Sequence, residues 1–380
     1  MVPFDFRPLT RVLFGTGASE RVGQVVGELG AHRVLLVADA GVVAAGHATE
    51  AERMLKTRGI DAFLFKDFDA NPDSAMVEAG RAFAAPLAVD AIVAVGGGSS
   101  LDCAKGINFL LTNGGVMSDY RGYGKARTPL LPMVGVPTTA GTGSEAQSYA
   151  VISDAETHMK MACGDPSAAF RVALLDPSLT LSAPATVTAT AGYDAIAHAV
   201  ETAVTTRRTP LSDGFSHQAW RLLSGSYERV LAQPSDFEIR SSMQVGAYLA
   251  GMAIEQSMLG AAHACANPLT ARYDVPHGVA LAMLLPHVVR WNEEFAADRY
   301  ALLLAGSESA APAASAVETL ARKLEAIAKT GGLKTRLSDA GIDAAALPGL
   351  AMLAGQQWTG GFNPRPFDAD GALEIYKAAL

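Results

Sequence analysis

The chain has 380 residues, of which 49% are hydrophobic and 18% are charged, and its formal net charge is −8. This length exceeds one ordinary core and predicts at least two domains, while the composition excludes a largely disordered chain. The negative charge, with no run of Lys or Arg, argues against a nucleic-acid or anionic-membrane partner.

The N-terminal segment and the cysteines predict a cytoplasmic protein. Asp5 and Arg7 interrupt the apolar residues of the first 16, which argues against a secretory signal, and no window approaches the roughly 20 apolar residues of a membrane span. Cys103, Cys163 and Cys265 are odd in number and far apart, so neither a disulfide framework nor a thiolate metal site is expected.

The first half of the chain alternates short apolar runs with helical patterns. Near-continuous apolar strands separated by helices are typical of a parallel sheet that is covered on both faces. We therefore predict a doubly wound, Rossmann-like α/β domain. The predicted strands are residues 34–38, 62–65, 91–95 and 132–136, and helices are predicted around residues 49–58 and after residue 72.

The pattern becomes almost entirely helical after about residue 177. The simplest account is α/β plus all-α, with a dinucleotide-binding domain at 1–179 and a helical domain at 180–380. The most apolar window, 246–266, predicts a buried helix, and His263 lies towards the end of this apolar stretch. The predicted helices are residues 184–205, 213–231, 238–259, 278–293 and 316–330.

A glycine-rich segment, 96–102, lies where a predicted strand turns into a helix. Gly96, Gly97 and Gly98 permit positive φ angles and close approach of a ligand, and the N–H groups of the following helix form an anion site. We expect this loop to hold a pyrophosphate. The alternative is a tight turn without a ligand, because the spacing is not that of the usual dinucleotide fingerprint.

A second segment of small and hydroxyl residues, 137–145, also follows a predicted strand. Ligands of open α/β sheets bind in the crevice at the carboxyl ends of the strands, so both segments are expected to face the same ligand. Asp39 ends another strand, where it can accept hydrogen bonds from a ribose and repel a 2′-phosphate, favouring NAD over NADP. A solvated turn residue is the alternative for Asp39.

Four side chains of the helical half form a candidate metal site. Asp194 and His198 are four apart on one helix face, and His263 and His277 come from later segments, with Pro276 placing His277 on a first helical turn. For the first pair alone, a capping Asp and a core His are the alternative. One carboxylate with three imidazoles fits Fe²⁺ or Zn²⁺ and excludes a Ca²⁺ cage.

With these motifs in hand, the chain resembles the iron-containing, or group III, alcohol dehydrogenase family over nearly its whole length. The matching motifs are residues 96–102, 137–145, 192–201 and 273–279, with Asn363-Pro-Arg-Pro366 near the end. The resemblance implies a homodimer and a metal held by Asp194, His198, His263 and His277. With Gly96 and Asp102 of the first loop, the expected cofactor contacts are Asp39, Asn71, Gly97, Gly98, Ser99, Thr138, Thr139, Thr142, Lys160 and Leu179.

The expected reaction interconverts a small alcohol and its aldehyde or ketone by hydride transfer, with Fe²⁺ or Zn²⁺ as a Lewis acid on the substrate oxygen and NAD as the hydride carrier. A hydroxyacid–oxoacid transhydrogenase, a glycerol-dehydrogenase-like polyol dehydrogenase, a maleylacetate reductase and a catalytically silent binding protein are the alternatives. One departure from the family is Asn267, where many members have a His assigned to proton relay. Asn cannot titrate, so water or another group is expected to move the proton.

Overall fold

The computed structural model describes residues 4–305 and 313–380. These residues form an α/β unit, Phe6–Thr139 with Gly143–Ala183, and a helical unit that consists mainly of Pro184–Leu380 together with Ala140–Thr142. The sequence placed the boundary between residues 179 and 180, and the described units change over between Ala183 and Pro184.

A six-stranded sheet in the order β1-β9-β6-β4-β2-β3 forms the centre of the α/β unit. Every neighbouring pair in it is parallel, so the predicted parallel sheet is confirmed. The four predicted strands are its central strands and the β3 edge, whereas the sequence did not predict β1 and β9. The strands are β1 (Arg11–Phe14), β2 (Arg33–Val37), β3 (Asp61–Phe65), β4 (Ala91–Gly96), β6 (Met133–Pro137) and β9 (Val172–Leu175).

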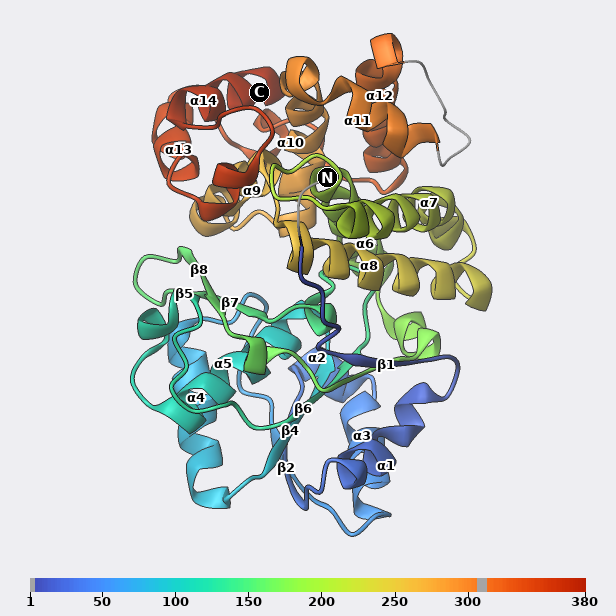
Figure 1. The fold of residues 1–380 in the computed structure, drawn as a ribbon, viewed down its shortest axis with the longest axis vertical. Coiled ribbons are helices and arrows are strands. Elements are labelled where there is room, and N and C mark those ends of the chain that lie inside the picture. The colour runs from blue at the N-terminus through green and yellow to red at the C-terminus, as the bar shows by residue number, and fades with distance from the viewer. Residues whose placement is uncertain (1–3, 306–312) are drawn as a thin grey trace. The chain divides into compact units, whose positions relative to one another are not determined.

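Helices cover both faces of this sheet, as its apolar strands require. Successive side chains of a strand point to opposite faces. In β2, Val34 and Leu36 therefore pack with α1 and α3, and Leu35 and Val37 pack with α4 and α5. The two pairs of helices lie on opposite sides of the strands in Figure 1. The helices are α1 (Val22–Glu28), α2 (Ala40–Ala44), α3 (His47–Lys56), α4 (Ser74–Ala84) and α5 (Gly98–Asn113).

A small three-stranded sheet in the order β5-β8-β7 completes the α/β unit. Its strands β7 and β8 form an antiparallel pair, and Ala150 and Ile152 of β7 join the apolar cluster beside α5. The strands are β5 (Gly122–Tyr123), β7 (Tyr149–Ser153) and β8 (Lys160–Gly164).

The helical unit is built around α6, every residue of which from Gly192 to Thr202 is buried. This helix packs against α7, α8 and α10. The helices are α6 (Ala185–Thr202), α7 (Pro210–Ala232), α8 (Phe237–Ser257), α9 (Ala261–Tyr273), α10 (His277–Trp291), α11 (Glu293–Ala305), α12 (Ala313–Thr330), α13 (Leu347–Ala354) and α14 (Ala369–Ala379).

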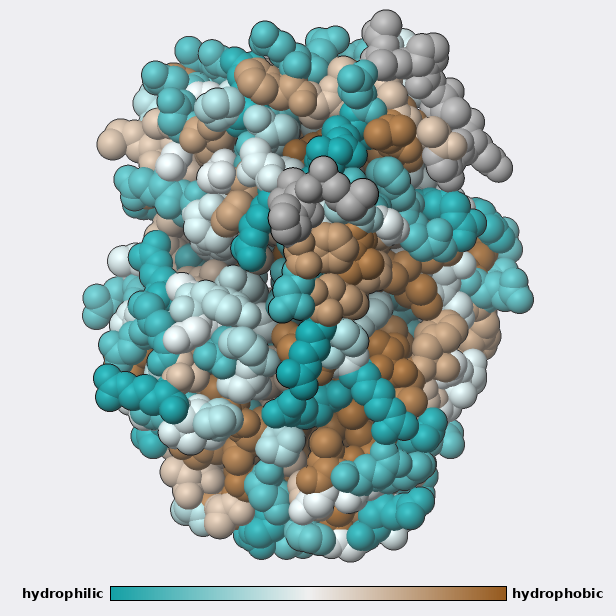
Figure 2. Space-filling model, viewed as in Figure 1, coloured by the Kyte–Doolittle hydropathy of each residue, from teal (hydrophilic) through white to brown (hydrophobic). Residues whose placement is uncertain are grey.

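The outer helices are amphipathic, and their polar faces reach solvent. In α3, for example, Ala48, Ala51 and Leu55 are buried, while Glu50 and Arg53 are exposed and form an ion pair. Figure 2 shows hydrophilic side chains interspersed with apolar ones over the visible surface of each unit. Within residues 4–305 and 313–380, every helix falls short of the length and apolarity that a membrane span requires.

The buried helix predicted over residues 246–266 is wrong as one element. Helix α8 ends at Ser257 and α9 begins at Ala261, with Met258 at a φ of 63° between them. His263 therefore lies in the first turn of α9 rather than towards the end of a long helix. The apolar run does not reveal the break because residues on both sides of it, Ile254, Met258 and Ala261, are buried.

Candidate functional site

Helix α6 places two of the predicted metal ligands on one face. Asp194 and His198 are four residues apart, the spacing at which helix side chains become neighbours. The Nε2 atom of His198 lies 3.2 Å from the Oδ1 atom of Asp194. Both residues are buried in the core of the helical unit, so this carboxylate has lost nearly all of its hydration.

Helices α9 and α10 bring the other two predicted ligands to the same carboxylate oxygen. The Nε2 atoms of His263 and His277 lie 3.5 Å and 3.9 Å from Asp194 Oδ1. His277 can approach because the next residue is Gly278, where a Cβ atom would overlap the Thr190 carbonyl of α6. Asp194, His263 and His277 each offer a ligand atom, and these atoms lie within 4.8 Å of one another.

The charge balance of this cluster favours a bound cation. Although burial acts to raise it, the nearby imidazoles of His198, His263 and His277 hold the pKa of Asp194 well below its usual range. Burial lowers the pKa of His198 to about 4, which keeps this imidazole neutral with a free lone pair. Burial also acts to lower the pKa of His263, but the carboxylates of Glu201 and Asp194 raise it to about 9. The carboxylates of Asp194 and Glu201 therefore stabilise a positive charge at His263.

The donor atoms also fit a metal ion. Within the described residues, Asp194 Oδ1 and His263 Nε2 are buried and have no hydrogen-bond partner. Buried polar atoms without partners are costly unless a ligand satisfies them. One carboxylate oxygen and imidazole nitrogens are ligands that Fe²⁺ and Zn²⁺ both accept, so the cluster can hold either ion.

Asn267 lies one helical turn beyond His263 in α9 and is buried. Its amide nitrogen donates a hydrogen bond to the Oε1 atom of Gln357 over 3.0 Å. Both members of this pair are amides, so neither changes its protonation near neutral pH. The pair cannot replace the His that many relatives are expected to have at this position.

In the α/β unit, the first glycine-rich loop joins β4 to α5. Gly96 has a φ of 148°, and a Cβ atom there would overlap the Ser100 side chain, so this position requires glycine. Gly97 is the N-cap of α5, and Gly98 and Ser99 form its first turn. The N–H groups at the start of this 16-residue helix are therefore available to an anion.

The loops after β2 and β3 meet this helix start. Ser100 donates a hydrogen bond to Asp39 over 2.9 Å, and the backbone N–H of Asn71 donates to Ser99 over 3.2 Å. Strands β2 and β4 are neighbours whose following connections lead to opposite sides of the sheet, through β3 and β6. This is a topological switch point, where open α/β sheets bind their ligands.

The second loop is held against the first by backbone and buried polar contacts. The N–H of Thr138 donates to the carbonyl of Gly96 over 3.0 Å, and Thr139 lies beside Gly97. Ser144 donates to the carboxylate of Asp102. Burial raises the pKa of Asp102, against the positive charges of Lys105 and Lys160.

The remaining predicted cofactor residues come from three different parts of the fold. Leu179 is in a 3-10 helix (Pro177–Ser182) that follows β9. It therefore lies beyond the carboxyl end of β9, as the two loops lie beyond the carboxyl ends of β4 and β6. Lys160 opens β8 of the small sheet. Thr142 belongs to the short segment that is part of the helical unit.

Two buried side chains near these groups had no role in the sequence analysis. Glu201 contacts His263, and its position seven residues after Asp194 on one helix face is a signal that the sequence contains. Lys105 is fully buried and donates to the backbone oxygens of Ser144, Gln147 and Tyr149 over 2.7–2.8 Å. No sequence spacing indicates these three acceptors.

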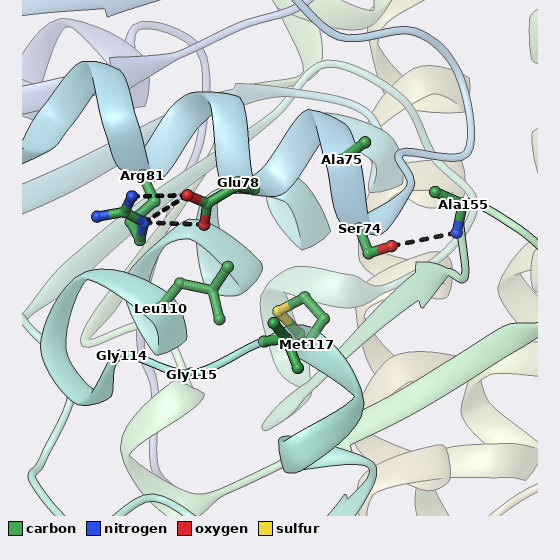
Figure 3. A pocket seen from close by; sticks show the side chains of 10 residues that line it. Ser74, Ala75, Glu78, Arg81, Leu110, Gly114, Gly115, Met117 and Ala155 are labelled. Carbon is green, nitrogen blue, oxygen red and sulfur yellow. Dashed lines mark hydrogen bonds and ion pairs between the residues drawn. The ribbon is translucent and has the colours of Figure 1, made fainter.

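A separate pocket of about 440 Å³ opens in the α/β unit beside α4 and the end of α5 (Figure 3). Its charged lining residues are Glu78 and Arg81, which form an ion pair of 2.6 Å. These two charges engage each other, and none of the predicted site residues lines the pocket. We do not assign it to the reaction.

Comparison with known proteins confirms the predicted family and fold. The family models "Iron-containing alcohol dehydrogenase" and "Fe-containing alcohol dehydrogenase family, C-terminal" match residues 9–177 and 188–380. The chain is 32% identical to the NAD-dependent methanol dehydrogenase of Bacillus methanolicus over 97% of each chain, and 34% identical to the 1,3-propanediol dehydrogenase of Klebsiella pneumoniae over 99% of each. The crystal structure of a 1,3-propanediol oxidoreductase matches 100% of both chains with a TM-score of 0.96 and 32% identity. The chain therefore belongs to the iron-containing alcohol dehydrogenase family.

Proposed function

We propose that this enzyme interconverts a small alcohol and its aldehyde or ketone, with NAD as the hydride carrier and Fe²⁺ bound in the helical unit. One observation carries the proposal. The Nε2 atoms of three histidines converge within 3.9 Å of one buried oxygen of Asp194. This arrangement is what a cation with oxygen and nitrogen ligands needs.

Asp194, His198, His263 and His277 are the proposed metal ligands. When bound, Fe²⁺ or Zn²⁺ supplies a Lewis acid that lowers the pKa of an alcohol oxygen and polarises a carbonyl. The carboxylate of Asp194 is ionised and the imidazole of His198 is neutral near pH 7, so both are in the form that donates a lone pair. Asp194, His198 and His263 are buried, which keeps bulk water away from them, whereas the side chain of His277 is 20% exposed.

The α/β unit is the proposed dinucleotide site. The N–H groups at the start of α5 hold the pyrophosphate, with help from the positive end of the helix dipole. Asp39 accepts hydrogen bonds from the adenosine ribose and repels a 2′-phosphate, which favours NAD. Thr138, Thr139, Thr142, Lys160 and Leu179 complete the proposed cofactor contacts.

The proposed substrates are short primary alcohols and their aldehydes. Two relatives are named for methanol and 1,3-propanediol, which are both of this class. The proton of the alcohol leaves through water or a group other than Asn267, because an amide does not titrate. The proposal therefore defines the class of reaction. The residues that line the substrate pocket select the chain length of the alcohol.

The test is a panel of alcohols and aldehydes assayed with NAD(H) and NADP(H) on protein loaded with Fe²⁺ or with Zn²⁺. We expect metal-dependent turnover of short primary alcohols with NAD, and reduction of the matching aldehydes with NADH. Turnover that is equal in metal-free protein would contradict the proposal. Turnover without added NAD would instead indicate a transhydrogenase. Sedimentation of the same preparation tests the predicted homodimer.

A further inference from the structure

Glu201 contacts His263 on the side of the imidazole opposite the metal cluster. One carboxylate oxygen, Oε2, makes a short contact with the Nδ1 atom of His263, while the Nε2 atom of the same ring faces Asp194. The other oxygen, Oε1, accepts the backbone N–H of Ala262 over 2.7 Å. Glu201 and His263 are 3% and 4% exposed, so water does not compete for these contacts.

The carboxylate of Glu201 is fixed because it also caps a helix. Helix α9 begins after Gly260, which has no side chain to satisfy the first N–H groups of the helix. Glu201 accepts the N–H of Ala262, and the Oδ1 atom of Asn363 accepts the N–H of Ala261 over 3.2 Å. A Cβ atom at Gly260 would lie 2.9–3.0 Å from both acceptor oxygens, so glycine leaves the space they occupy.

Asn363 is itself held in place by buried polar groups. Its amide nitrogen donates to Asn292 and to the carbonyl of Arg365, each over 2.8 Å. Both Asn363 and Asn292 are buried. The N–H groups of Ala261 and Ala262 in the first turn of α9 are therefore capped by buried side chains from α6 and from the C-terminal segment.

We propose that Glu201 is a positioning residue that fixes the tautomer and the ring orientation of His263. A neutral imidazole has one N–H and one lone pair. In the neutral form of His263 that can bind a metal, Nδ1–H is donated to Glu201 and the lone pair of Nε2 faces Asp194, His198 and His277. Partners of this kind raise the affinity of a ligating His for its metal. The inference rests on the proposed function, in which this cluster holds the metal.

The Glu201→Gln variant tests the proposal because a Gln side chain has only one acceptor oxygen. Two donors, Ala262 N–H and His263 Nδ1–H, need two acceptors. The backbone N–H cannot change, so the Gln oxygen pairs with Ala262 and its NH₂ group faces Nδ1 of His263. His263 then moves its proton to Nε2, which blocks the lone pair that the metal needs.

Two further variants separate positioning from helix capping. Asn363→Ala removes the neighbouring cap of α9 and leaves the contact between Glu201 and His263 intact. Asp213→Asn changes a carboxylate in the same unit that pairs with Arg208 and Arg299 and has no part in the cluster. Both variants are expected to change thermal stability more than metal affinity.

The experiment measures the affinity of the full-length, metal-free protein for Zn²⁺ by competition with a chelator. We expect Glu201→Gln to weaken binding roughly 10- to 100-fold, the usual effect of losing an outer partner of a metal-bound His. Asn363→Ala and Asp213→Asn should stay within about threefold of the unchanged protein, a margin well below that loss. Circular dichroism establishes that each variant is folded.

A measurement on the unchanged protein keeps the proposal testable if Glu201→Gln does not fold. In Zn²⁺-loaded, ¹⁵N-labelled protein, NMR should show His263 protonated on Nδ1 and bound through Nε2. Metal bound through Nδ1, equal affinity of Glu201→Gln, or an equal loss in Asn363→Ala would each overturn the proposal. An unchanged protein that binds neither Zn²⁺ nor Fe²⁺ would instead refute the proposed function.

Discussion

The Nε2 atom of His198 lies 3.2 Å from the Oδ1 atom of Asp194, one turn further along the buried helix α6. Local helix geometry alone produces this pair, since residues four apart share a face. The same oxygen is reached by His263 and His277 only through the packing of α9 and α10 against the core. Asp194 is therefore the one group on which the whole cluster depends.

Changing Asp194 to Asn keeps the shape of the side chain and removes its charge. We expect iron and zinc to be lost almost completely, because the loss of a ligand exceeds the roughly 10- to 100-fold effect of an outer partner. Elemental analysis of purified protein measures the metal, and circular dichroism checks the fold. His287→Gln, in α10 and outside the cluster, should keep its metal. A metal-replete Asp194→Asn protein would refute the ligand assignment.

Lys105 is expected to be essential for the stability of the α/β unit. Its ammonium group is fully buried and donates to three backbone carbonyls, those of Ser144 in the second loop, of Gln147 and of Tyr149 in β7. Breaking a buried charged network costs about 3–5 kcal/mol, so Lys105→Met should lower the melting temperature by roughly 10 °C or more. Lys56→Met removes only a surface pair with Glu52 and should cost about 0.3–0.5 kcal/mol. Calorimetry compares the two, and similar melting temperatures would contradict this role.

The central part of the fold could be predicted because its residues are patterned locally. The strands β2, β3, β4 and β6 are apolar runs between helices, and each was predicted to within a few residues of its observed bounds. The strands β1 and β9 were not predicted, because each is a run of only four residues and the two strands that pair are far apart in the sequence. Pairing over such a distance leaves no local signal.

The residues of the candidate site also divide into those that a local sequence pattern predicts and those that it does not predict. Asp194 and His198 share one helix and could be paired from their spacing, and Glu201 follows at the same periodicity. The start of α9 could not be located, because the helix is capped by Glu201 and Asn363 rather than by a neighbouring residue. The order of apolar residues does not reveal a cap that comes from another part of the fold.

Asp39 is expected to control the choice between NAD and NADP. Its carboxylate accepts the hydroxyl of Ser100 and the N–H of Val42, which places the negative charge beside the start of α5. Asp39→Ala removes the charge that repels a 2′-phosphate and should raise the ratio of kcat/KM for NADP over NAD about tenfold, which corresponds to ~1.4 kcal/mol.

The Asp39→Asn variant is the matched control for Asp39→Ala. It keeps an oxygen that can cap α2, so it loses less of the ~1 kcal/mol that a missing N-cap costs. Both variants lack the negative charge and should shift the cofactor preference in the same direction. If only Asp39→Ala changes the preference, the effect comes from the helix cap rather than from the charge.

Glu145 is expected to make the enzyme less stable at neutral and alkaline pH than at acidic pH. Burial raises the pKa of this carboxyl from its ordinary value of 4.5 to about 7. The folded state therefore holds the proton more tightly than the unfolded state, and stability falls as the pH rises from 4.5 to about 7 and then levels off. The loss corresponds to roughly 3 kcal/mol. Glu145→Gln should remove it.

Melting temperatures of the unchanged protein and of Glu145→Gln between pH 5 and pH 9 test this expectation. The variant should match the unchanged protein at the acidic end and exceed it at the alkaline end. Glu50→Gln is the control with the opposite sign, because the hydrogen bond from Arg53 lowers the pKa of Glu50, and its small contribution is lost as the pH falls. The expectation is contradicted if Glu145→Gln melts at or below the temperature of the unchanged protein at pH 9. Glu145 would then be ionised at no cost in the folded state, and its carboxyl would not be the source of the stability that is lost as the pH rises.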